Sequence, residues 1–129
     1  MKNIISWILQ IIAAIIMLQT LYFKFTGAEE SILIFSTIGM EPRGRYMTGI
    51  MELIAGILLL TRNWNFLGAL LGIGLMVGAI FFHLTTLGIE VQGDGGYLFG
   101  LAVTVLISSL GVVALNFDKL TIFLKRFSS

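Results

Sequence analysis

Four stretches of the chain are apolar for long enough to predict membrane-spanning helices. They cover about residues 4–23, 46–61, 66–87 and 97–117. A bilayer core of about 30 Å needs about 20 helical residues, and three of the stretches reach that length. The second is shorter, so we expect it to begin in a locally thinned bilayer or to be shielded by its neighbours. Residues 1–129 therefore predict a single all-α domain, an integral membrane four-helix bundle.

Within each stretch, small or polar residues recur every three or four positions and so trace one face of a helix. The remaining faces carry Leu, Ile, Val and Phe. Apolar faces gain little from one another in lipid, so small and polar residues mark where helices approach, and we expect these faces to point inward. They comprise Gln10, Ala13, Met17, Thr20 and Lys24; Arg45, Gly49, Glu52 and Gly56; Gly68, Gly72, Met76, Ala79 and His83; and Tyr97, Gly100, Thr104, Ser108 and Gly111.

The longest connection, between the first two stretches, predicts a short helix over residues 29–40. Thr26 and Glu29 have the spacing of a capping box, and Gly39 followed by Pro42 predicts where the helix stops. This pattern is typical of an amphipathic helix on the outer membrane surface, lidding the bundle. An ordinary capped connector is the alternative.

Composition and charge support a membrane protein. The chain is 57% hydrophobic and 12% charged, with a mean hydropathy of +1.00, whereas a soluble domain has about 25% charged residues. A net charge of +1 gives no basic face for nucleic acid. Five of the eight Lys and Arg residues fall on the side of the termini, which predicts that both termini are cytoplasmic. With no cysteine and one histidine, the sequence holds no haem, iron–sulfur or metal motif.

The candidate chemistry starts from Glu52, a carboxylate in the middle of the second apolar stretch. An ionisable side chain inside a bilayer costs about 2.5–3.5 kcal/mol on insertion scales, so it usually faces a partner or a watery cavity. At the usual helical rise, Glu52 lies about 9 Å and His83 about 6 Å inward from the outer ends of their helices. Lys24 ends the first stretch on that side, and Arg45 lies above Glu52. We therefore expect an outer pocket with four ligand-binding or proton-relay candidates: Lys24, Arg45, Glu52 and His83.

A structural alternative stays open for Lys24, Glu52 and His83. Glu52 paired with Lys24 would hold two helices together, and a single histidine on an apolar face, such as His83, can simply pack through hydrogen bonds. Four further residues are expected either to line the pocket or to serve as helix contacts and core packing. These are Gly49, Gly56, Met76 and Tyr97.

Several of these residues form a pattern of fixed order and spacing. The pattern is Lys24-x-Thr26-Gly27, then Gly49-x-x-Glu52-x-x-x-Gly56, then Met76 and His83. In these motifs, over about residues 5–115, the chain resembles the DoxX family of small four-helix membrane proteins. The resemblance implies a prokaryotic plasma membrane protein. Family namesakes resemble the small membrane component of a thiosulfate:quinone oxidoreductase, and distant eukaryotic relatives behave as transport receptors or assembly chaperones, so fold transfers better than activity.

Two functions are expected from these observations. In the first, the protein is a membrane subunit associated with an oxidoreductase, at most an accessory one, and its outer pocket binds quinone or another small lipophilic ligand. Electrons would then come from a soluble or membrane redox partner. In the second, the protein is a non-catalytic membrane scaffold or chaperone that binds a partner membrane protein or a lipid. A homo-oligomer is compatible with both.

Overall fold

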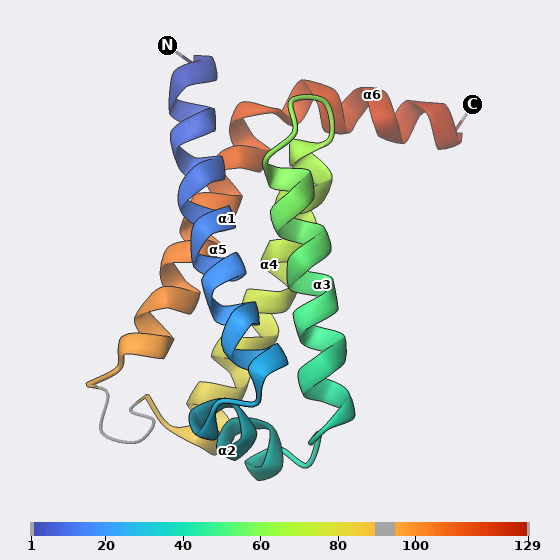
Figure 1. Ribbon diagram of the computed structural model, residues 1–129. Helices are drawn as coiled ribbons and strands as arrows, with labels where there is room; N and C mark the ends of the chain where they lie inside the picture. Colours follow the sequence, from blue (N-terminus) through green and yellow to red (C-terminus); the bar gives the residue numbers. More distant parts are fainter. Residues whose placement is uncertain (1, 90–94, 129) are drawn as a thin grey trace.

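The computed structural model describes residues 2–89 and 95–128, and all regular structure in these residues is helical (Figure 1). Within these described residues, six α-helices and one short π-helix follow one another. They are α1 (Lys2–Thr26), α2 (Glu29–Thr37), α3 (Arg43–Leu59), α4 (Asn65–Phe82), η1 (His83–Leu87), α5 (Tyr97–Leu115) and α6 (Phe117–Ser128). The π-helix η1 continues directly from α4, so the two form one helical segment.

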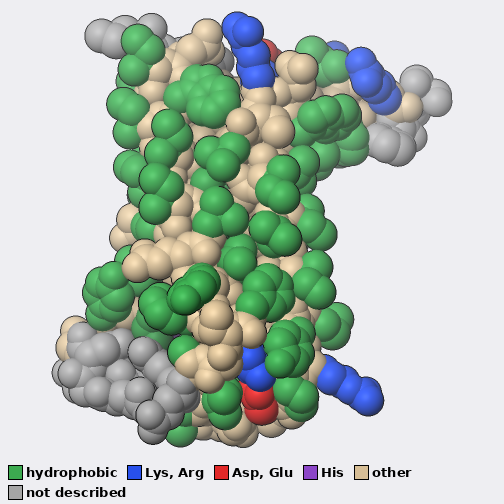
Figure 2. Space-filling view, in the orientation of Figure 1, with side chains coloured by type: hydrophobic (Ala, Val, Ile, Leu, Met, Phe, Trp, Pro, Cys, Tyr) green, Lys and Arg blue, Asp and Glu red, His purple; other side chains and the backbone are tan. Residues whose placement is uncertain are grey.

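In the part of the chain that the structure describes, three helical segments are long and apolar enough to cross a membrane. They are Asn3–Thr26 in α1, Asn65–Leu87 in α4 and η1, and Tyr97–Leu115 in α5. Hydrophobic side chains cover the flank of the molecule, whereas charged side chains gather toward its two ends (Figure 2). Because a bilayer core accepts apolar side chains and excludes charges, these features indicate an integral membrane protein.

Helices α1, α3, α4 and α5 lie side by side (Figure 1), and α1 and α4 each pack against both α3 and α5. Helix α3 has 17 residues, or about 26 Å of helix, which is shorter than a bilayer core of about 30 Å. It begins three residues before the predicted stretch and ends two residues before the end of that stretch. Both termini lie at one end of the molecule and α2 lies at the other.

Helix α2 lies in the longest connection, but it does not begin with the predicted capping box. Its N-cap residue is Ala28, which has no side-chain cap. Thr26 is instead the last residue of α1, and its hydroxyl donates to the carbonyl oxygen of Tyr22 at 2.8 Å. A threonine in a helix can bond its own preceding turn in this way, and is then not available to cap the next helix. Helix α2 also ends earlier than predicted, at Thr37, before Gly39 with a φ of +76°.

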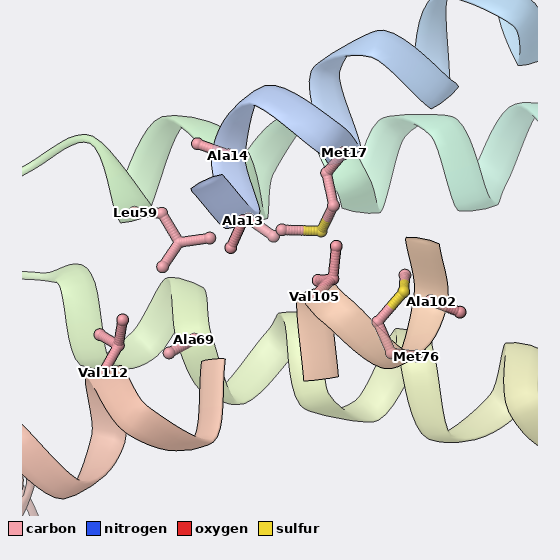
Figure 3. Close-up of a cluster of buried hydrophobic side chains, with 10 residues drawn as sticks. Ala13, Ala14, Met17, Leu59, Ala69, Met76, Ala102, Val105 and Val112 are labelled. Atoms are coloured by element: carbon pink, nitrogen blue, oxygen red, sulfur yellow. The ribbon is translucent and has the colours of Figure 1, made fainter. Parts of the chain in front are cut away.

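Small and medium side chains fill the space between α1, α3, α4 and α5 (Figure 3). Small residues at these positions let helix backbones approach closely, which is how helices associate in lipid. The predicted inward faces of α1, α3 and α4 contribute Ala13, Glu52 and Gly72, all buried. The apolar core consists of Ala13, Ala14, Met17, Ala55, Leu59, Ala69, Met76, Ala102, Val105 and Val112.

The predicted inward face of α5 is confirmed only in part, because Ser108 is buried but three other members are not. Tyr97, Gly100 and Thr104 are exposed, although the predicted face included all three. The hydroxyl of Thr104 donates to the carbonyl oxygen of Gly100 at 2.8 Å. Because this bond satisfies the hydroxyl within its own helix, Thr104 has no need of a polar interior. The buried residues of α5 are Ala102, Val105, Ser108, Ser109 and Val112.

The last predicted stretch, residues 97–117, is wrong at its C-terminal end. Helix α5 ends at Leu115, and a separate helix, α6, begins at Phe117. Between them, Asn116 is buried, and its side-chain amide donates to Ser6 Oγ and to the carbonyl oxygen of Val112, both at 2.8 Å. These bonds stabilise the point where the chain turns.

Candidate ligand-binding site

Glu52 of α3 is buried and paired with two residues of α1. Its side chain is 2% exposed, and its Oε1 lies 2.7 Å from Lys24 Nζ, whose side chain is 17% exposed. The second oxygen, Oε2, accepts a hydrogen bond of 2.6 Å from Thr20 Oγ1. Thr20 and Lys24 are four positions apart on α1, so their side chains emerge on one face and reach the same carboxylate. The carboxylate therefore has both oxygens engaged, one by a charge and one by a neutral donor.

A cavity of about 480 Å³ opens beside this pair. Ligand pockets for small molecules typically have a volume of about 300–1,000 Å³ and mostly apolar walls with a few polar groups. The walls here come from α1, α4, η1 and α5, with one side formed by α2 and a small contribution from α3. Its polar lining includes Thr20, Lys24, Ser31, Thr48, Glu52 and His83, and its apolar lining includes Met17, Phe23, Ile34, Phe35, Met76, Ala79, Phe82, Leu101, Ala102 and Val105.

His83, the first residue of η1, lines the cavity. Its Nδ1 lies 2.9 Å from the carbonyl oxygen of Gly88, and its ring packs edge-on against Phe99 with the centroids 5.6 Å apart. A carbonyl oxygen can only accept, so Nδ1 carries the proton in this contact. In the neutral ring, Nε2 is then an acceptor. Within the described residues, no hydrogen-bond partner of Nε2 is found. The contact of Nδ1 with Gly88 therefore orients the ring.

Arg45 lies outside the cavity lining, in contrast to the predicted pocket rim. Its guanidinium bonds both carboxylate oxygens of Glu41 at about 3.0 Å and the carbonyl oxygen of Lys24, and it lies 4.4 Å from the ring centroid of Tyr46. Arg45 thus ties the start of α3 to the end of α1. A long, flexible arginine side chain near the start of a helix can bond neighbouring acidic and backbone groups in this way. The position of Arg45 in the sequence did not predict which of these groups it bonds.

Gly49 and Gly56 also lie outside the cavity lining, at the contact between α3 and α1. A Cβ atom at Gly49 would stand 3.0 Å from the Phe25 ring, and one at Gly56 would stand 3.0 Å from Leu18 Cδ2. Both glycines therefore allow α1 to approach α3 closely. This agrees with the alternative prediction that they serve as helix contacts.

Met76 and Tyr97 do line the cavity, as proposed for both. Met76 is 8% exposed and belongs to the apolar core, so it serves as wall and as packing at once. Tyr97 is 58% exposed and stands at the first residue of α5. The structure thus brings Lys24, Glu52 and His83 together with these two residues around one cavity.

Two groups of residues were not among the predicted site residues. The first is the α2 wall: the sequence predicted a lidding helix here, but Phe35, which is 7% exposed, was not among the candidate pocket residues. The second is a polar network at the opposite end of the helices. There Gln10 donates to the carbonyl oxygen of Leu59 at 2.7 Å and accepts from Ser6 and Asn65 at 2.6 and 2.9 Å. Ser6 and Gln10 are four positions apart, which was the signal for this network.

The site can therefore bind a compact, mostly apolar molecule and offer it a cation, a carboxylate and an imidazole acceptor. Within residues 2–89 and 95–128, no group of three or more His, Asp or Glu side chains is placed to hold a metal ion. No protein-family model, curated protein or solved structure matches the chain. The function of the cavity has to be inferred from its own chemistry.

Proposed function

We propose that the chain is a DoxX-like membrane protein whose cavity binds quinone or a similar small lipophilic ligand, as an accessory subunit of an oxidoreductase. The observation that carries this proposal is the combination of an apolar cavity of about 480 Å³ with three polar groups at its wall, Lys24, Glu52 and His83. Ionisable side chains at membrane depth are expensive to bury and typically mark ligand or proton pathways.

The proposal includes four transmembrane helices. Helix α3 is short, but α1 and α4 pack against it on either side, so its polar residues need not meet lipid and its ends can be reached by local thinning. Four spans return the chain to its starting side, which agrees with both termini lying at one end (Figure 1). The excess of Lys and Arg at that end makes it the cytoplasmic side, and the cavity then opens in the outer half of the bilayer.

The proposed ligand follows from which hydrogen bonds the wall can make. Lys24 has N–H groups beyond the one directed at Glu52 and can donate to a carbonyl oxygen of the ligand. Neutral His83 offers Nε2 as an acceptor, so it favours a hydroxyl group. A quinone ring carries an oxygen at each end, and its reduced form carries hydroxyls, so it suits this pair of groups in an apolar slot. The described residues hold no redox cofactor motif, so electron transfer is assigned to a partner subunit.

A second candidate is favoured by one specific observation. Both oxygens of Glu52 are already engaged, by Lys24 and by Thr20. Such a pair can hold α1 and α3 together without contacting a ligand. The protein would then be a scaffold or chaperone that binds a membrane partner or a lipid through its apolar surface, and the cavity would hold bulk lipid chains.

Mass spectrometry of the purified protein distinguishes the two functions. The protein is extracted from its membrane in mild detergent, and bound quinone and lipid are quantified for the wild type and for His83→Ala. Thr85→Ala is the matched control, because Thr85 lies in the same π-helix but is exposed and outside the cavity lining. We expect near-stoichiometric quinone in the wild type and the control, and loss in His83→Ala. Bulk phospholipid alone in all three would support the scaffold.

A further inference from the structure

Helix α6 separates apolar from charged residues around its circumference. At 3.6 residues per turn, Phe117, Leu120 and Leu124 lie on one side, and Phe123 lies at the margin of that side. Asp118, Lys125 and Arg126 lie across from them. This arc of apolar residues spans about a third of the circumference, as in helices that bury one face. Ile122 is the one apolar residue on the charged side among those whose side chains are described.

Contacts of Phe123 and Lys119 help to hold α6 crosswise at the end of the bundle where the termini lie (Figure 1). The ring of Phe123 packs against Trp64 and Phe66, with centroids 6.2 and 5.6 Å apart. Lys119 Nζ donates to the carbonyl oxygen of Arg62 at 2.6 Å. These contacts involve the first two turns of α6 and one margin of its apolar arc. They leave Phe117 and Leu124 exposed, at 60% and 56%.

The orientation of α6 determines what meets this exposed arc. Because α1, α4 and α5 are long and apolar enough to cross the bilayer, a helix that runs crosswise to them at one end (Figure 1) lies along the membrane surface. Figure 2 shows basic side chains on the outer side of this end and hydrophobic side chains beneath them, continuous with the apolar flank. Apolar residues toward the bilayer and Lys or Arg toward the head groups are the arrangement of an interfacial helix.

We propose that α6 is a membrane-surface helix that binds the anionic leaflet on the side of the termini. Leu124 and Phe117 enter the boundary between head groups and acyl chains. Lys125 and Arg126 contact lipid phosphates, for which an anionic leaflet supplies the complementary charge. The surface lies at the opposite end of the molecule from the cavity, so it is independent of the ligand that the cavity binds.

Single-cysteine labelling tests this proposal in the full-length protein, because the natural chain has no cysteine. Leu124→Cys and Ile122→Cys form a matched pair, because the two side chains are 56% and 55% exposed but lie on different sides of α6. Each variant carries a nitroxide label and is reconstituted in vesicles of phosphatidylglycerol and phosphatidylcholine. Collision of the label with oxygen, which concentrates in lipid, is compared with collision with a water-soluble nickel chelate.

We expect the ratio of oxygen to nickel collisions to be several-fold higher at Leu124→Cys than at Ile122→Cys. Replacing Lys125 and Arg126 by Gln should raise nickel access at Leu124→Cys, because each lost cation weakens attraction to an anionic surface on the order of five-fold. Equal nickel access at both positions would show that α6 stands in water. Protection of Leu124→Cys from both reagents would show that protein covers it. Either result would overturn the proposal.

Discussion

The pair formed by Glu52 and Lys24 predicts an unusual order of stabilities among its variants. Removing one partner of a buried ion pair typically costs about 3–5 kcal/mol of the free energy of unfolding, because it leaves an uncompensated charge. The side chain of Glu52 is short and 2% exposed, whereas that of Lys24 is 17% exposed and long enough to reach toward the surface. We therefore expect Lys24→Met to destabilise the protein by about 3–5 kcal/mol. Glu52→Gln should cost less, since its amide oxygen can still accept from Thr20.

The double variant is the informative member of this series. With both charges removed, no charge is left unpaired, and replacing a whole buried ion pair is often close to neutral. The double variant, Lys24→Met with Glu52→Gln, should therefore be more stable than Lys24→Met alone. A double-mutant cycle measures this coupling as the difference between the double-variant effect and the sum of the two single effects. Reversible unfolding in mixed detergent micelles, followed by the fluorescence of Trp7 and Trp64, measures the free energies. Simple addition of the two single effects would refute the reasoning.

Two further predictions concern helix contacts. A Cβ at Gly68 would stand 2.7 Å from the backbone nitrogen of Leu59, so Gly68→Ala should lower the free energy of unfolding by about 1–3 kcal/mol. Gly74 lies on the same helix, and a Cβ there would have no neighbouring atom within 4 Å, so Gly74→Ala should not lower the free energy of unfolding. Equal effects of the two variants on unfolding in micelles would contradict this. Gln10→Leu removes the centre of the polar network and should cost about 1–3 kcal/mol. The exposed Gln19→Leu should cost much less, and a thermal melt that ranks the two equally would count against the network.

The helix positions and the pairing of Lys24 with Glu52 could be predicted from the sequence, because large free-energy costs in lipid determine both. Long apolar runs have to be helical in lipid, and a carboxylate at that depth needs a cation at the same level. The predicted pair indeed lies 2.7 Å apart. His83 reached the same cavity because its depth matched theirs.

The remaining errors have local causes that a single sequence does not reveal. Thr104 satisfies its hydroxyl within α5, so its polarity did not indicate the buried face. Arg45 bends toward Glu41 and the end of α1 rather than toward the cavity. Helix α6 alternates charged and apolar residues, so a search for long apolar runs ends before it. Two of these errors come from polar side chains, Thr104 and Arg45, that bond groups close to them in the chain, and the third comes from the short apolar runs of α6.

The central claim is that the cavity itself binds the ligand, and filling the cavity tests it most directly. Ala79 lines the cavity, so Ala79→Phe should occupy its space while leaving Lys24, Glu52 and His83 in place. Val77→Phe adds a phenyl ring to the same helix at a position that is 53% exposed and outside the lining. Quantified by mass spectrometry after mild extraction, quinone should remain with the wild type and Val77→Phe and be lost from Ala79→Phe. Equal quinone in all three proteins would contradict the account.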